Sequence, residues 1–99
     1  MRRASRTDSN HAAIVEAYEA HGCTVLSLAR MGDGCPDLLV GYRGRLALVE
    51  VKAARGRLRP AQEDFQRRWP VRVVRTVDDV QAHLGALRAS DAPCPPERP

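Results

Sequence analysis

The sequence predicts a single mixed α/β domain built from three helices and four strands. Apolar residues recur at helical spacing in three segments, and short apolar or β-branched runs typical of strands fill four others. These segments follow one another in the order α-β-β-β-α-β-α, which indicates a mixed central sheet flanked by helices. A chain of 99 residues suits one compact core. We place the domain at residues 8–89, between a basic N-terminal segment (1–7) and a proline-rich tail (90–99) that are both expected to be disordered.

The first predicted helix begins at residues 8–10, where Asp, Ser and Asn are all suitable N-caps. Its apolar stripe runs from Ile14 to His21, and Gly22 supplies a stop signal. Residues 23–29 alternate loosely and predict the first strand. A glycine-rich loop follows that strand.

A β-hairpin is predicted from residues 37–52. Residues 37–42 form one strand, Arg43-Gly44 the turn, and residues 45–52 the returning strand. Because both strands are densely apolar, we expect a sheet that is covered on both faces.

The second half of the chain predicts a helix, a strand and a further helix. Pro60 is tolerated in a first helical turn and Pro70 ends the segment, so the helix covers residues 60–69. Residues 71–75 form a short strand of β-branched residues. A last helix opens at residue 76 or 77 and continues to about residue 88.

The charge and cysteine content limit the classes of function. A formal net charge of +4 suits a polyanionic partner, and nucleic acid is the first to consider. The three cysteines form no CxxC pair, which favours reduced thiols inside a cell. No apolar run approaches the ~20 residues that a membrane span needs, so we expect no membrane association and a cytoplasmic protein.

Three charged residues converge at one end of the predicted hairpin. Side chains alternate faces along a strand, so Glu50 and Lys52 point the same way. The tight turn folds the start of the preceding strand back, which brings Asp37 close to both. Two carboxylates supply the hard oxygen ligands that Mg²⁺ or Mn²⁺ prefers, and an ammonium beside them suits a phosphate or an activated water.

A simpler interpretation treats Glu50 and Lys52 as a surface ion pair and Asp37 as a turn residue. The basic residues weigh against it, because fifteen are arginine and Lys52 is the single lysine. Lysine is a compact charge whose pKa can shift, whereas arginine stays protonated. A site that needs this property explains the exception.

The segment "GCPDLLVGYRGRLALVEVK" resembles the PD-(D/E)XK nuclease signature, with Asp37 followed by Glu50-Val51-Lys52. More narrowly, it is similar to small stand-alone VRR-NUC domains of phages and prophages. The resemblance covers residues 8–85 and includes the start of the following helix, Leu58-x-Pro60-x-Gln62, and a late segment at residues 73–78.

This resemblance implies a restriction-endonuclease-like αβββαβ core and a prokaryotic or phage-encoded intracellular protein. It implies that Asp37, Glu50 and the backbone carbonyl of Val51 bind Mg²⁺ or Mn²⁺. Lys52 would be the catalytic lysine, and Gln62 would support the site. The family often has a glutamate on the first helix, where this chain has Ala13. Glu16, one turn later, is the candidate to replace it; the alternative is that Glu16 lies on a solvated face, because it falls nearly opposite the stripe of Ile14 and Tyr18.

Arginines in loops form a second group of candidate functional residues, beside Asp37, Glu50 and Lys52. Bidentate guanidinium contacts to phosphates fix a nucleic acid without reading its sequence. Phe65 and Trp69 lie four residues apart on a helix and are expected in the core, so no aromatic platform for bases is predicted. The candidate phosphate-binding residues lie in loops: Arg30, Arg43, Arg55, Arg57 and Arg59.

These observations favour a metal-dependent endonuclease that hydrolyses DNA. A chain of 99 residues has little surface for a duplex, so we expect a homodimer acting on branched or double-stranded DNA such as Holliday junctions, without a small-molecule cofactor. One alternative is a nuclease-fold protein that binds nucleic acid without turnover. Another is a small basic adaptor domain with no nucleic-acid role.

Overall fold

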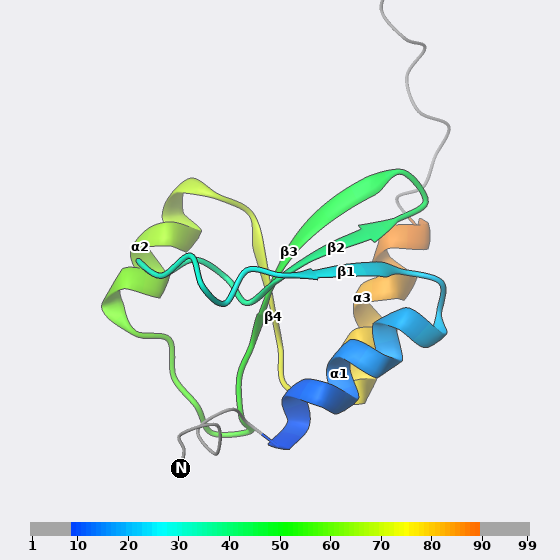
Figure 1. The fold of residues 1–99 in the computed structure, drawn as a ribbon, viewed down its shortest axis with the longest axis horizontal. Helices are drawn as coiled ribbons and strands as arrows, with labels where there is room; N and C mark the ends of the chain where they lie inside the picture. The colour runs from blue at the N-terminus through cyan, green and yellow to red at the C-terminus, as the bar shows by residue number, and fades with distance from the viewer. Residues whose placement is uncertain (1–8, 90–99) are drawn as a thin grey trace, which may run out of the picture.

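The computed structural model describes residues 9–89, which form seven elements (Figure 1). Their order agrees with the predicted order, and the mixed α/β class is confirmed. Both predicted tails, residues 1–7 and 90–99, lie outside the described residues. The elements are α1 (Ser9–Ala20), β1 (Thr24–Ser27), β2 (Leu38–Tyr42), β3 (Arg45–Val51), α2 (Pro60–Arg68), β4 (Val71–Val74) and α3 (Val77–Ala89).

The four strands form one mixed sheet in the order β1-β2-β3-β4. The β1–β2 and β2–β3 pairs are antiparallel, whereas β4 runs parallel to β3. The predicted hairpin is confirmed: Tyr42 pairs with Arg45 across a two-residue turn. Arg43 and Gly44 have φ angles of 54° and 79°, the left-handed conformation at both turn positions that matches the twist of hairpin strands.

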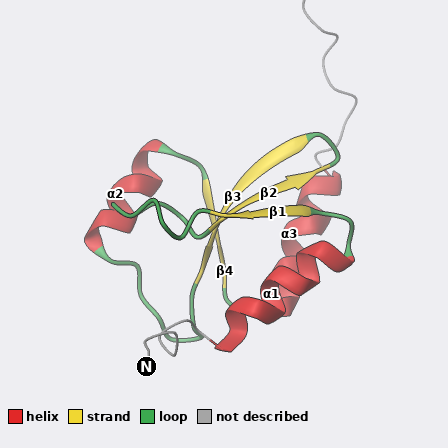
Figure 2. Cartoon of the chain, in the orientation of Figure 1, coloured by secondary structure: helices red, strands yellow, loops and turns green. Residues whose placement is uncertain are grey.

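The core lies between one face of this sheet and the helices α1 and α3, which pack together on the same side (Figure 2). Helix α1 contributes Ile14 and Tyr18 of the predicted apolar stripe to the core, and both are fully buried. Alternate residues of β2 and β3 meet them, because side chains of one parity share a face. The buried core residues from the sheet and α3 are Leu38, Val40, Tyr42, Val49, Val51, Val74, Val80 and Leu84.

The opposite face of the sheet is only partly covered, and here the prediction of two covered faces is wrong. Helix α2 lies on this side but is only nine residues long (Figure 2). Pro70 follows it and ends the helix. Leu46 is therefore 74% exposed and Leu26 56% exposed. Trp69, predicted to lie in the core, is 51% exposed at the end of α2, although it stacks on Phe65 with ring centroids 5.7 Å apart.

None of the helices in residues 9–89 is long and apolar enough to cross a lipid bilayer.

Candidate active site

The predicted site residues meet where β2 begins and β3 ends. Asp37 immediately precedes β2, and its Oδ2 accepts a hydrogen bond of 2.8 Å from the backbone N–H of Val51. The register pairs Leu38 with Val49, so Asp37 lies opposite the last residues of β3. Strand parity then places the side chains of Glu50 and Lys52 on the partly covered face. The ammonium Nζ of Lys52 lies 3.6 Å from Oε2 of Glu50.

Glu50 is a buried carboxylic acid, with 3% of its surface exposed. Burial, and next the negative charge of Asp37, raise its pKa to about 7, while Lys52 opposes the shift. A carboxyl with this pKa is half protonated near neutral pH. The ionised form needs further positive charge beside it, because a buried carboxylate is costly unless it is paired.

Gln62 orients Glu50 from the first turn of α2. Its Nε2 donates a hydrogen bond of 3.0 Å to Glu50 Oε2, and its Oε1 accepts one of 2.8 Å from the backbone N–H of Arg59. The second bond fixes the amide orientation, since Oε1 can only accept. The predicted supporting role of Gln62 therefore has a geometric basis: its amide links the helix start to the buried acid.

The glycine-rich loop before Asp37 packs against the same helix start. A Cβ atom on Gly34 would lie 2.3 Å from the carbonyl oxygen of Ala61, and the φ of Gly34 is +79°. Only glycine permits both the left-handed conformation and this close approach. The loop thus holds α2, and with it Gln62, near Asp37.

Asn10 is a site residue that the sequence did not reveal as one. It was a candidate N-cap, but α1 begins at Ser9, so Asn10 lies within the first turn. Its Nδ2 donates to the carbonyl oxygens of Lys52 at 3.0 Å and Arg75 at 2.8 Å. These bonds span 42 and 65 residues of sequence, a separation at which no periodic signal exists. Asn10 therefore joins α1 to the ends of β3 and β4.

Glu16 does not reach this group. It is exposed on α1, six residues beyond Asn10, a rise of about 9 Å along the helix. Ile14 and Tyr18 occupy the buried stripe, so Glu16 points elsewhere. Its exposure agrees with the alternative that Glu16 lies on a solvated face, and Asn10 is the residue by which α1 contacts Lys52.

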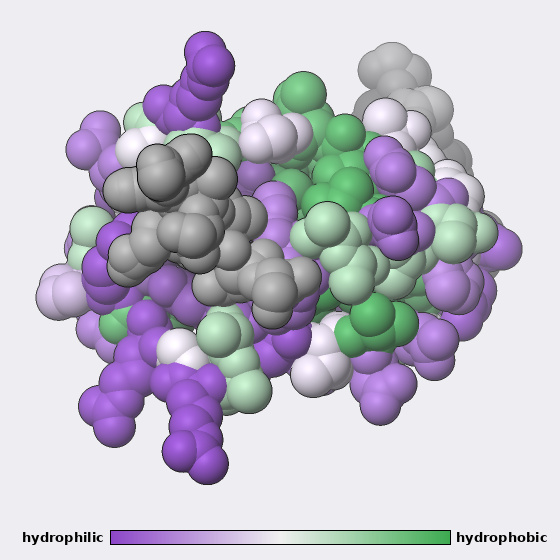
Figure 3. Space-filling model, turned by 60° about the horizontal axis from the view of Figure 1, so that its bottom comes forward, coloured by the Kyte–Doolittle hydropathy of each residue, from purple (hydrophilic) through white to green (hydrophobic). Residues whose placement is uncertain are grey.

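The loop between β3 and α2 carries three of the predicted phosphate-binding residues, Arg55, Arg57 and Arg59, all exposed. The guanidinium of Arg75 holds this loop, since Nη1 donates to the carbonyl oxygens of Ala53 and Gly56, both at 2.7 Å. Figure 3 shows hydrophilic residues projecting at the left, the side on which α2 and this loop lie in Figure 1.

The other two predicted arginines differ in position. Arg30 is exposed in the loop after β1, and this loop stays near the site because the N–H of Leu28 donates to the carbonyl of Asp37 at 2.7 Å. Arg43 sits in the hairpin turn, at the far end of β3 from Glu50, and its guanidinium lies 5.3 Å from the Tyr42 ring centroid. From Arg45, the first residue of β3, to Glu50 is a step of five residues, about 17 Å along the strand, and Arg43 lies in the turn before Arg45, so its prediction as a residue flanking the site is wrong.

The metal-ligand candidates in residues 9–89 are few. The described residues hold no group of three or more His, Cys, Asp and Glu side chains that could bind a metal ion. The carboxylates of Asp37 and Glu50, with the adjacent Val51 carbonyl, are the predicted set. Their chemistry fits a hard divalent cation, because the set is all oxygen and its two carboxylates have the single ammonium of Lys52 beside them.

Comparison with known proteins gives no match to any family model, curated protein or solved structure.

Proposed function

We propose that the chain is a metal-dependent endonuclease that hydrolyses phosphodiester bonds in DNA. The observation that carries this proposal is the buried carboxyl of Glu50, whose pKa is raised to about 7 beside Asp37, with the only lysine of the chain 3.6 Å away. A structural ion pair has no need of a second carboxylate. A divalent-cation site does.

The resemblance to PD-(D/E)XK nucleases, and to VRR-NUC domains in particular, supports the same function. The motif residues Asp37, Glu50 and Lys52 come from separate points in the sequence and share one end of the sheet. The element order is also compatible with the αβββαβ core that this superfamily would require. We therefore propose a restriction-endonuclease-like core for this domain.

Asp37, Glu50 and the carbonyl of Val51 would hold Mg²⁺ or Mn²⁺. Such an ion supplies Lewis acidity toward a phosphate and lowers the pKa of water. Gln62 keeps the Glu50 carboxyl oriented through the 3.0 Å hydrogen bond, and the Val51 N–H fixes Asp37.

Lys52 would orient the attacking water and neutralise charge on the phosphate. Its side chain is 15% exposed and its ammonium lies 3.6 Å from Glu50. The Lys52 backbone is held on both sides, by Asn10 and by the carbonyl of Val74 at 3.0 Å. A positioned ammonium loses little freedom on binding, which favours the transition state.

The exposed arginines of the loop before α2 would bind DNA phosphates next to the site. Because one small domain offers little surface to a duplex, we propose a homodimer that presents two sites to two strands of branched DNA.

A cleavage assay tests this function directly. The wild-type chain with Mg²⁺ or Mn²⁺ is expected to cut a four-way DNA junction, and EDTA to stop the reaction. Glu50→Gln and Lys52→Ala should each lower the rate about a hundredfold or more, because the first weakens a ligand of the cation and the second removes the ammonium that acts at the phosphate. Glu19→Gln, an exposed change on α1, is the control and should cut normally. Junctions left uncut by wild type and variants alike contradict the proposal.

One observation favours a second candidate, a nuclease-fold protein that binds nucleic acid without turnover. Helix α1 contacts the site through Asn10, and this chain has Ala13 where the family often has a glutamate. Among the described residues, only Asp37 and Glu50 offer carboxylates at this site. This alternative predicts DNA binding that weakens with salt but is unaffected by EDTA or by Asp37→Asn. Cation-dependent cleavage excludes it.

A further inference from the structure

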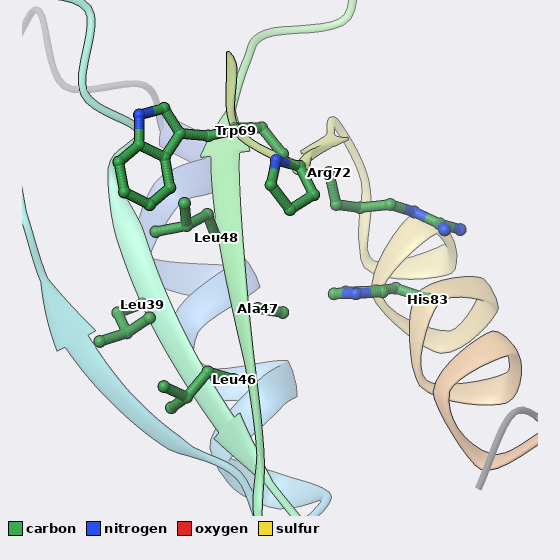
Figure 4. Close-up of a pocket in the computed structure, with 9 residues that line it drawn as sticks. Leu39, Leu46, Ala47, Leu48, Trp69, Arg72 and His83 are labelled. Atoms are coloured by element: carbon green, nitrogen blue, oxygen red, sulfur yellow. The ribbon is translucent and has the colours of Figure 1, made fainter. Parts of the chain in front are cut away.

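A groove of about 560 Å³ lies along the first half of β3, where Leu46, Ala47 and Leu48 line it, and the residues that line it do not include Asp37, Glu50 or Lys52. Figure 4 shows that it straddles the edge of this strand. Leu39, Leu48 and Trp69 lie on one side of the strand, and His83 and Arg72 lie on the side of α3. Leu46 also lines the groove and is the most exposed large apolar residue of the described chain. A large exposed apolar surface of this kind marks an interaction site.

On the side of β4, the backbone of β3 is unpaired at Leu46, the first of the β3 residues that line this groove. Strand β4 pairs with β3 only from Leu48 onward, whereas β2 pairs from Arg45 onward. The N–H of Lys52 points to β4, and backbone groups of the same parity point the same way, so those of Leu46 face the open edge. Pro70 has no N–H and does not extend β4 along this edge. Among the described residues, no strand lies beside Leu46 on that side.

The polar groups of the groove suit a ligand that carries hydrogen-bond acceptors or negative charge. None of the residues that line it is acidic. Arg72 is exposed and has no ion-pair partner in residues 9–89. His83 is 4% exposed, and its Nδ1 bonds the Tyr18 hydroxyl at 2.7 Å. The second ring nitrogen, Nε2, has no partner among the described residues.

The Nε2 nitrogen of His83 can therefore donate a hydrogen bond to a ligand, while Tyr18 holds the buried ring in place. Burial, and next the charge of Arg72, lower its pKa to about 4, so the ring is neutral at pH 7. Burial raises the pKa of Tyr18, so its hydroxyl keeps its proton. When that hydroxyl donates to Nδ1, the hydrogen of His83 is on Nε2. Ala47 on β3 is the small residue that leaves the space in front of the ring open (Figure 4).

We propose that this groove binds an extended peptide segment of a protein partner, in which apolar residues alternate with acidic ones. The segment pairs its backbone with Leu46 and so continues the sheet beyond β3. Its apolar side chains cover Leu46, Leu48 and Trp69, and the side chains of opposite parity carry carboxylates to Arg72 and His83. The peptide chemistry follows from the alternation of strand faces and from the charge of the groove.

Trp69 is the only tryptophan of the chain and reports binding by its fluorescence. The probe is a capped peptide in which valine alternates with glutamate, titrated in EDTA without nucleic acid, so the result is independent of nuclease activity. We expect a saturable change in emission. A peptide with lysine in place of glutamate should bind about tenfold more weakly or worse, since charge-assisted hydrogen bonds are lost. N-methylation of the amides that face β3 should remove binding.

Three variants locate the site. Leu46→Glu should abolish binding and Arg72→Gln should weaken it severalfold. Leu26→Glu changes an exposed leucine of the same sheet face outside the groove and should bind normally. Both leucine positions are exposed, so neither substitution should unfold the domain.

Two outcomes overturn the proposal. One is no fluorescence change with the glutamate peptide at millimolar concentration, or equal binding by the lysine peptide. The other is a wild-type dimer that Leu46→Glu converts to a monomer in light scattering, which assigns the groove to a second copy of the chain.

Discussion

At the residue scale, the carboxyl of Glu50 determines the character of the candidate site. Its partners are few and well defined: Gln62 donates to it, Lys52 lies 3.6 Å away, and Asp37 repels its charge. Strand parity predicts that Glu50 and Lys52 share a face, and a tight hairpin predicts the approach of Asp37. Asn10 and Arg75 could not be predicted in this way, because a side chain that bonds a distant backbone carbonyl leaves no pattern in the sequence.

Asn10→Leu tests the connection between α1 and the site. The substitution leaves the partly buried carbonyls of Lys52 and Arg75 without the donor from Asn10. Oδ1 of Asn10 is itself buried and has no hydrogen-bond partner within residues 9–89, and removing it offsets part of the loss. We expect the free energy of unfolding to fall by about 1 to 3 kcal/mol in urea denaturation, with slower cleavage where the variant is folded. An unchanged midpoint would show that these bonds contribute nothing.

At the scale of elements, the strands and helices are largely predictable and their packing is not. The period-2 and period-3.6 patterns place every element, and the two-residue turn sets the hairpin register. Apolar density in β3 wrongly suggests two covered faces, because it does not record how short α2 is or where β4 starts. Trp69 and Leu46 are exposed for that reason. The predicted turn at Arg43-Gly44 already places Arg43 at the opposite end of the hairpin from Asp37 and Glu50, as the structure confirms.

Two glycines of the loop before β2 test how this loop holds α2. Gly34→Ala places a methyl group against the Ala61 carbonyl, whereas Gly32→Ala meets open space. Both have positive φ, at +79° and +69°, so both incur backbone strain of about 1 to 2 kcal/mol. Only Gly34→Ala should lose more than this in thermal or urea unfolding, and only it should disturb Gln62. Equal losses for the two variants would refute the contact with α2.

At the scale of the whole molecule, the buried side chains of Glu50 and His83 have opposite effects on how stability changes with pH. In the cation-free protein the pKa of Glu50 is raised from 4.5 to about 7, so it contributes stability at low pH that is lost as the pH rises through about 7. The pKa of His83 is lowered from 6.5 to about 4, so it contributes stability at high pH that is lost as the pH falls through about 4. Each effect reaches about 3 kcal/mol.

The two effects offset each other between pH 4.5 and 6.5, where both groups are shifted. For Glu50→Gln in EDTA, the free energy of unfolding measured in urea should therefore decrease, relative to the wild type, as the pH is lowered through this range. For His83→Gln, the free energy of unfolding should increase, relative to the wild type, as the pH is lowered through the same range. Variant curves that run parallel to the wild-type curve would contradict the shifted pKa values.

The carboxylates of Asp37 and Glu50 are also the proposed cation site. Binding of a cation between them is the most direct test of the proposed function. Crystals soaked in Mn²⁺ should show an anomalous peak between Asp37 and Glu50, and Glu50→Gln crystals treated identically should lack it. No peak at saturating Mn²⁺, or an equal peak in the variant, would contradict the assignment of this site to a divalent cation.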